Sequence, residues 1–285
     1  MVELLTAPLA YSFMQRGFLA SLMVGVLCAV VGCYVILRSM AFLGDALAHA
    51  ILPGVAIAYL LKGDLMVGAL VAAVVVALAI GFFSRHGAMR EDTAIGIMFA
   101  AALSLGVALI STIRTYAVDL THILFGNVLG VTWGNLWLTA ALGCLVLGTI
   151  ALLYKQFLVV TFDPVLAATL RLPAELLRNL MLILLALTIV VSLQTVGVGL
   201  VAAMLVTPAA TAYLLTRRLS AMMAVSAAIG AFSSVAGLYV SYYIDVASGA
   251  AVVLTATFIF LVVFMIAPRR GMVWEWVRRL DTQSA

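Results

Sequence analysis

The chain has 285 residues, of which 66% are hydrophobic and only 9% are charged. Because a soluble domain carries about 25% charged residues, this composition excludes an ordinary soluble protein and indicates an integral membrane protein in contact with membrane lipid. The formal net charge of +4 comes from Lys and Arg near the ends of apolar stretches, which argues against nucleic acid as a partner.

Apolar stretches of roughly 20 residues, the length of a helix that crosses a bilayer, recur along the whole chain. Strand-like alternation is absent, and lipid leaves helices to satisfy so many backbone groups. We therefore predict an all-α polytopic membrane protein with eight or nine transmembrane helices in a single domain, residues 1–285. The thin Gly-Val-Gly divider at 197–199 leaves the count open by one. The predicted spans are 17–37, 41–61, 65–84, 93–113, 133–154, 179–196, 198–216, 221–243 and 248–267.

The positions of the 15 Lys and Arg residues predict the orientation. If the C-terminus is cytoplasmic, all of them except Arg16, Lys62 and Arg114 face the cytoplasm, in agreement with the positive-inside rule. The two lysines, Lys62 and Lys155, lie outside any G-x-x-x-x-G-K-[ST] motif. The chain is therefore not predicted to be an enzyme, and any ATP that drives it must bind to another subunit.

Most ionisable residues lie at span ends, but Asp45 and His49 lie inside an apolar stretch, F-L-G-D-A-L-A-H-A-I-L-P-G. A charge at mid-membrane costs roughly 2.5–3.5 kcal/mol, so such residues are functional candidates. Their i, i+4 spacing puts both on one helix face, where they can bind a divalent cation or relay a proton. The alternative is an Asp–His hydrogen bond that fixes helix packing. Two ligands make a poor metal site, and a homodimer with its two-fold axis beside this helix would supply four.

The predicted cytoplasmic connection contains the segment T-F-D-P-V-L-A-A-T-L-R-L-P-A-E-L-L-R at 161–178. Asp163 is typical of a helix N-cap and Pro164 of the first helical position, and Pro173 opens the next helix. A short capped helix between two spans offers a rigid knob to a cytosolic partner. The alternative is an ordinary connector between two helices.

Other candidate residues carry weaker signals. Predicted loops hold His86, Asp119, His122 and Asp245. His122, in an outside loop, could meet incoming cargo, but an ordinary loop histidine is the simpler interpretation. The cysteines, Cys28, Cys33 and Cys144, show no paired spacing, which indicates packing rather than a zinc site or a disulfide.

Four blocks of sequence, taken in order, resemble the membrane permease subunits of ABC importers for manganese, zinc and iron, the ABC-3 type metal permeases. The resemblance extends over nearly the whole chain. The blocks are R-S-M-A-F-L-G-D-A-L-A-H-A-I-L-P-G at 38–54, E-D-T-A-I-G-I-M-F-A at 91–100, L-F-G-N-V-L-G-V-T at 124–132 and V-G-V-G-L-V-A-A-M-L-V-T-P-A-A-T-A at 196–212.

The resemblance implies an ABC importer permease fold in a bacterial inner (plasma) membrane, as a homodimer bound to two cytosolic ABC ATPase subunits. An extracytoplasmic metal-binding protein would deliver the cargo. Asp45 and His49 would line the path of transported Mn²⁺, Zn²⁺ or Fe²⁺, with manganese favoured by the form of the third block and no cofactor bound permanently. The segment 161–173 would be the coupling helix. Its residues directed at the ATPase would be Asp163, Pro164, Ala167, Ala168 and Arg171.

The sequence departs from the family pattern at two places. Arg171 stands where members commonly have Gly, a residue that suits a left-handed helix end. The usual P-[ST]-G before the last span is here Ala247-Ser248-Gly249. These departures affect the expected end of the coupling helix and the shape of one loop.

Two other functions are weighed against the importer. A proton-coupled secondary transporter would use Asp45 and His49 as a relay and need no ATPase. An intramembrane metalloprotease would use them as zinc ligands, but the sequence has no H-E-x-x-H motif and no glutamate inside a predicted span. The capped cytoplasmic helix and the lack of charged residues on the other predicted spans favour the importer over the secondary transporter.

Overall fold

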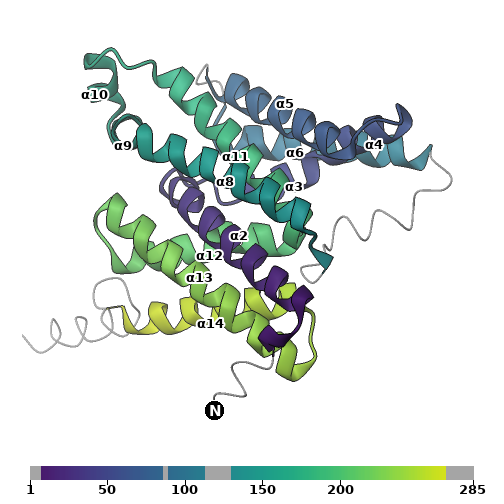
Figure 1. Ribbon diagram of the computed structural model, residues 1–285. Coiled ribbons are helices and arrows are strands. Elements are labelled where there is room, and N and C mark those ends of the chain that lie inside the picture. Colours follow the sequence, from purple (N-terminus) through teal and green to yellow (C-terminus); the bar gives the residue numbers. More distant parts are fainter. Residues whose placement is uncertain (1–7, 86–88, 113–129, 268–285) are drawn as a thin grey trace, which may run out of the picture.

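The computed structural model describes residues 8–85, 89–112 and 130–267, and in these ranges the chain consists of helices and short connections (Figure 1). Nine segments of the described ranges are long and apolar enough to cross a membrane, which confirms the predicted all-α fold. His86, Asp119 and His122 lie outside the described residues. The elements are η1 (Pro8–Ala10), α2 (Ser12–Leu37), α3 (Leu43–Ala50), α4 (Leu52–Leu60), α5 (Leu65–Arg85), α6 (Glu91–Ser111), α8 (Trp133–Leu152), α9 (Tyr154–Phe162), α10 (Pro164–Thr169), α11 (Ala174–Val196), α12 (Val198–Leu215), α13 (Leu219–Ile244) and α14 (Ser248–Ile266).

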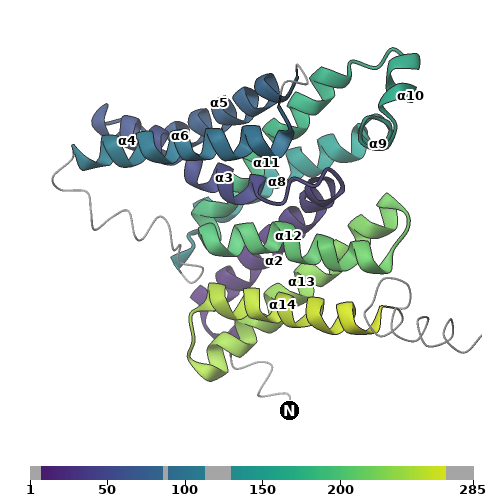
Figure 2. The same ribbon diagram turned by 180° about the vertical axis from the view of Figure 1, so that it is seen from behind.

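The helix α2 is at the centre of the bundle, where it packs against α8, α11, α12 and α13. Figures 1 and 2 show α13 and α14 on one side of it and α5 and α6 on the other. Gly32 lies so close to α12 that a Cβ there would overlap the carbonyl oxygen of Leu205. On α13, the Ser226 hydroxyl donates to the Ala29 carbonyl oxygen at 2.8 Å. Small residues at crossings are what lets membrane helices pack this closely.

The span predicted at 41–61 is divided into α3 and α4, which counts as one membrane crossing. Proline causes the break, because Pro53 has no N–H to donate to the carbonyl of His49, four residues earlier. Before α3, the chain leaves α2 through a tight turn in which Ser39 has a left-handed φ of 58°. The Met40 N–H closes this turn on the Val35 carbonyl oxygen at 3.0 Å. The metal candidates therefore lie on a two-turn helix with a fixed entry and a break at its end.

The connection after α8 holds more helix than the sequence predicts. Leu153 separates α8 from α9, whose Phe157 is buried with its ring centroid 5.9 Å from that of Tyr34. Beyond α10 and α11, the predicted divider at 197–199 shrinks to Gly197, with a φ of 87° that favours glycine. At the other predicted departure, Ala247 is the N-cap of α14, and Ser248 and Gly249 are already helical.

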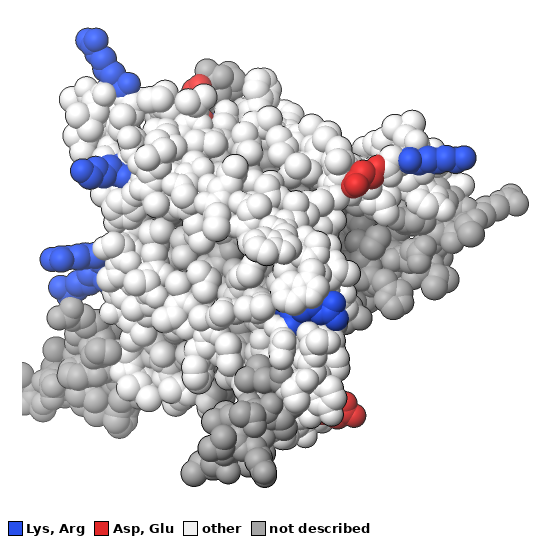
Figure 3. Space-filling view, viewed as in Figure 1, with Lys and Arg blue, Asp and Glu red and all other residues white. Residues whose placement is uncertain are grey.

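The ends of the bundle differ in charge. In the space-filling view, Lys and Arg gather along the left edge, the side where Figure 1 shows α10, and most of the surface between the two edges is white (Figure 3). The described helices also expose many large apolar side chains, among them Leu254, Phe258 and Leu261 of α14. Such an apolar surface is what contact with lipid requires.

Candidate functional site

Asp45 and His49 lie one turn apart on α3, as their spacing predicts. The Nδ1 atom of His49 is 3.5 Å from the Oδ1 atom of Asp45 and 3.0 Å from the backbone carbonyl oxygen of Asp45. The Asp45 side chain is 51% exposed and that of His49 is 29% exposed. Both groups therefore reach a face of the single chain that the rest of the chain leaves open.

The short contact to the backbone carbonyl fixes the role of each ring nitrogen of His49. A carbonyl oxygen only accepts, so Nδ1 donates its hydrogen to it, and in a neutral ring Nε2 then carries the lone pair. A histidine that donates through one nitrogen to a backbone carbonyl and presents the other is oriented as metal-binding histidines generally are. The Asp45 carboxylate beside it adds an anionic oxygen donor.

The helix α3 is held tightly on its other sides by α5, α6, α11 and α12. Its small residues Gly44, Ala46, Ala48 and Ala50 are buried, which lets these neighbours approach closely. From α6, Phe99 places the edge of its ring against His49, with centroids 5.7 Å apart and planes at 86°. Phe99 was not predicted from the sequence, because the contact joins residues fifty positions apart.

One chain offers too few ligands for a complete metal site. Among the described residues, no group of three or more His, Cys, Asp or Glu side chains is close enough to hold a metal ion. Asp45 and His49 are thus a half-site of one oxygen and one nitrogen donor. Further ligands would have to come from water bound to the metal ion or from another chain.

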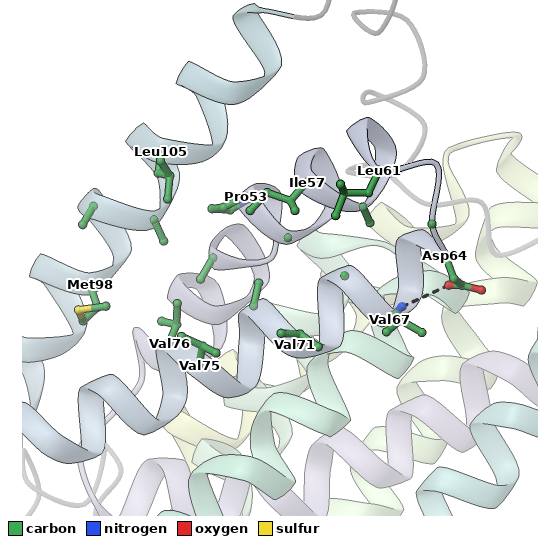
Figure 4. Close-up of a pocket in the computed structure, with 18 residues that line it drawn as sticks. Pro53, Ile57, Leu61, Asp64, Val67, Val71, Val75, Val76, Met98 and Leu105 are labelled. Atoms are coloured by element: carbon green, nitrogen blue, oxygen red, sulfur yellow. Dashed lines mark hydrogen bonds between the residues drawn. The ribbon is translucent and has the colours of Figure 1, made fainter.

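A groove of about 770 Å³ adjoins this half-site, lined by α4, α5 and α6. Figure 4 shows Pro53, Val71 and Leu105 among the apolar side chains around it. At one end, the Asp64 carboxylate accepts hydrogen bonds from the N–H groups of Met66 and Val67, at 2.7 and 3.2 Å. That carboxylate serves as a cap for α5, so the groove itself is an apolar surface rather than a cation site.

The predicted N-cap of the short helix α10 is present, and its other end, which Arg171 left open in the sequence, is capped as well. The Asp163 Oδ1 atom accepts from the Leu166 N–H at 2.9 Å, and Pro164 opens α10. At the other end, Arg171 has a left-handed φ of 52°, and its N–H and that of Leu172 bond to the carbonyls of Ala168 and Ala167, each at 3.0 Å. This pattern is the Schellman motif, formed with Arg where Gly is usual.

The residues expected to face a partner differ in exposure. Asp163, Ala168 and Arg171 are exposed, whereas Ala167 is fully buried. Because its side chain points into the protein, Ala167 supports α10 from behind and cannot itself offer a contact. The sequence did not single out the apolar side chains that α10 does expose, Val165, Leu166 and Leu170. In Figures 1 and 2, α10 projects at a corner of the molecule.

A cluster of ionised side chains joins four span ends near α10. The Glu91 Oε1 atom, at the start of α6, is 3.8 Å from Nη1 of Arg178 on α11 and 4.0 Å from Nη2 of Arg38 at the end of α2. Arg178 Nη2 also donates to the carbonyl oxygen of Gly81 on α5 at 2.7 Å. Burial lowers the pKa of Arg38, an effect that Glu91 opposes and Arg178 reinforces.

Known proteins resemble this chain over nearly its whole length. The manganese transport system membrane protein MntC of Halalkalibacterium halodurans is 47% identical over 95% of this chain and 92% of that protein. The manganese import system permease protein ScaB of Streptococcus gordonii is 42% identical over 91% of this chain and 93% of that protein. A chain in the structure of PsaBC from Streptococcus pneumoniae in complex with Fab is 39% identical, with a TM-score of 0.83 over 94% of this chain and 97% of that chain.

The family model of the ABC 3 transport family matches residues 10–267. The match includes α3 with Asp45 and His49, the capped helix α10 and every predicted span. It agrees with the sequence blocks that resemble ABC-3 permeases and with the shared fold. This chain therefore belongs to the ABC 3 transport family.

Proposed function

We propose that the chain is the permease subunit of an ATP-driven importer of divalent metal, with manganese as the favoured cargo and zinc or iron as the alternatives. The observation that carries the proposal is the open half-site of Asp45 and His49 on α3 in a member of this family. The names of the manganese permeases MntC and ScaB support the choice of metal. The carboxylate oxygen suits manganese and the imidazole nitrogen suits zinc and iron, so the donor set admits all three metals.

The half-site is proposed to be completed by a second copy of the chain. A two-fold axis beside α3 brings the Asp45 carboxylates and the His49 imidazoles of both copies together, which gives four ligands. An open carboxylate facing lipid would cost a few kcal/mol, which supports a protein-covered or water-filled face there. The site must bind weakly enough to release its ion.

The α10 end is proposed to face the cytoplasm, with α10 docked on a separate ABC ATPase subunit. The Lys and Arg residues gathered at this end support this orientation, in which the C-terminus is proposed to be cytoplasmic. The exposed apolar residues of α10, held by two caps, support the docking role. An extracytoplasmic metal-binding protein would deliver the ion at the opposite end.

Uptake by the complete complex in proteoliposomes tests the proposal. With the ATPase, the binding protein and ATP present, we expect uptake of manganese, and Asp45→Asn or His49→Ala should lower it by at least about tenfold. Both variants should assemble normally, because they remove donors at an open face. Asp64→Asn is the matched control, since an Asn still caps α5.

The outcomes separate the alternatives. If Asp45 and His49 only fix helix packing, their variants lose assembly while the surviving complexes transport normally. Uphill uptake by the purified chain without an ATPase would favour a secondary transporter. Competition among Mn²⁺, Zn²⁺ and Fe²⁺ in the same vesicles ranks the cargo metals.

A further inference from the structure

We propose that Glu91 is a positioning residue for transport: it ties the helix that follows α10 to the two elements that hold the metal half-site. The inference rests on the proposed function, since it takes α10 as the ATPase contact and α3 as the cation helix. It goes further by assigning a role to Glu91, Arg38 and Arg178, which belong neither to the half-site of Asp45 and His49 nor to α10.

The first link runs from α10 to Glu91. Helix α11 begins at Ala174, five residues after the last residue of α10, and the connection contains the Schellman turn and Pro173. Arg178 lies in the second turn of α11. A displacement of α10 therefore reaches the Arg178 guanidinium through a short and well-braced connection.

The second link runs from Glu91 to the half-site along two elements. Glu91 is the first residue of α6, the helix whose Phe99 contacts the His49 ring. The second arginine that Glu91 contacts, Arg38, is the C-cap of α2. From there the chain leads into α3 through the turn closed by the Met40 N–H. Movement at Glu91 is thus transmitted to His49 through a ring contact and to Asp45 through the entry of α3.

The Glu91 carboxylate is shared between the guanidinium groups of Arg38 and Arg178. One oxygen atom lies 3.8 Å from one guanidinium and 4.0 Å from the other, both longer than a charge-assisted hydrogen bond of about 2.7–2.9 Å. A shift of about an ångström would bring this oxygen within hydrogen-bond distance of either arginine. Both arginine side chains are only 16% exposed, so water competes little. Alternative pairings of Glu91 with Arg178 or with Arg38 are the kind of discrete arrangement that transmission between sites requires.

The test measures metal ions imported per ATP hydrolysed by the complete complex in proteoliposomes. For Glu91→Gln we expect ATP hydrolysis within about twofold of the parent protein and import lowered by about tenfold, within the usual range of coupling between sites. Asp92→Asn is the matched control, because Asp92 is the next residue of α6 and is exposed. It should leave the ratio unchanged.

Removing the carboxylate leaves two guanidinium groups side by side, so the single variant can fail to fold. The pair Glu91→Gln with Arg38→Gln removes one charge of each sign and keeps the bond from Arg178 to Gly81. We expect this pair to assemble with a normal yield and still show the lowered ratio. Glu91→Asp keeps the charge on a shorter side chain and should recover part of the import per ATP that Glu91→Gln loses.

A ratio equal to that of the parent protein in the assembled pair variant would overturn the inference. So would a proportional fall of hydrolysis and import in both Glu91 variants, which indicates only lost complex. Failure of the proposed function looks different, because the parent complex would then import no metal or Asp45→Asn would import it normally.

Discussion

Leucine substitutions at the neighbouring positions 167 and 168 should affect two different properties of α10. Ala167 is fully buried and its carbonyl accepts the Leu172 N–H of the Schellman motif. Ala168 is exposed on the same short helix. The pair therefore adds the same isopropyl group once to a packed interior and once to an open surface.

The magnitudes follow from the packing. A side chain enlarged in a filled interior typically costs about 1–3 kcal/mol, so Ala167→Leu should lower the stability of the permease by that amount. Leu and Ala differ little in helix propensity, so Ala168→Leu should change stability by less than about 0.5 kcal/mol. At a docked surface, however, the added group keeps the partners apart. A loss of about 1.4 kcal/mol there corresponds to tenfold weaker binding.

Two measurements on each purified variant test the different roles of Ala167 and Ala168. Thermal unfolding of the purified permease in detergent reports stability, and binding of the purified ATPase subunit to permease in nanodiscs reports docking. We expect Ala167→Leu to lower the unfolding temperature and Ala168→Leu to weaken ATPase binding by about tenfold with the unfolding temperature unchanged. Normal ATPase binding by a stable Ala168→Leu protein would refute α10 as the docking element.

The other predictions concern stability and use the same thermal assay, with limited proteolysis added for α10. Gly32→Ala should be strongly destabilising, because its Cβ meets the Leu205 backbone, whereas Gly96→Ala, with nothing within 4 Å of the new Cβ, should be neutral or stabilising; equal effects would show that the α2–α12 contact is looser than described. Asp163→Ala removes a cap worth about 1 kcal/mol and should free α10 to proteolysis, while Asp163→Asn should not. Arg171→Gly should stabilise by up to about 1 kcal/mol, since a left-handed φ costs a non-glycine residue roughly that; a loss of stability would mean that the Arg171 side chain makes a contact worth more than the strain.

Hydropathy was enough to predict the spans, because a bilayer requires apolar runs of one length whatever the tertiary structure. It did not predict the break in the second span, since Pro53 is tolerated within a membrane helix and its effect depends on neighbours. It also gave no sign of α9, because Leu153 is an ordinary helix former whose backbone angles are set by packing.

The site was predicted to the extent that it is local in sequence. The contact of Asp45 with His49 and the Asp163 cap at the start of α10 lie within one turn, so spacing alone indicates them. The capped end at Arg171 was not predicted, because Gly is usual in that motif. The contacts of Glu91 with Arg38 and Arg178 join residues 53 and 87 positions apart, and no periodicity reports such distances. Burial of Ala167 was missed for the same reason, because both alanines look alike in a six-residue helix.

The double capping of α10 has a mechanical consequence. A free helix of six residues would be mostly unfolded, because too few hydrogen bonds form to offset the cost of its first turn. Fixed by Asp163 at one end and by the turn at Arg171 at the other, α10 is a stiff element with little internal compliance. A force applied to its exposed side chains then does not unwind the ends of the helix. It passes on as a displacement of α11, so in the proposed importer the two caps would set how much of an ATPase movement reaches the membrane helices.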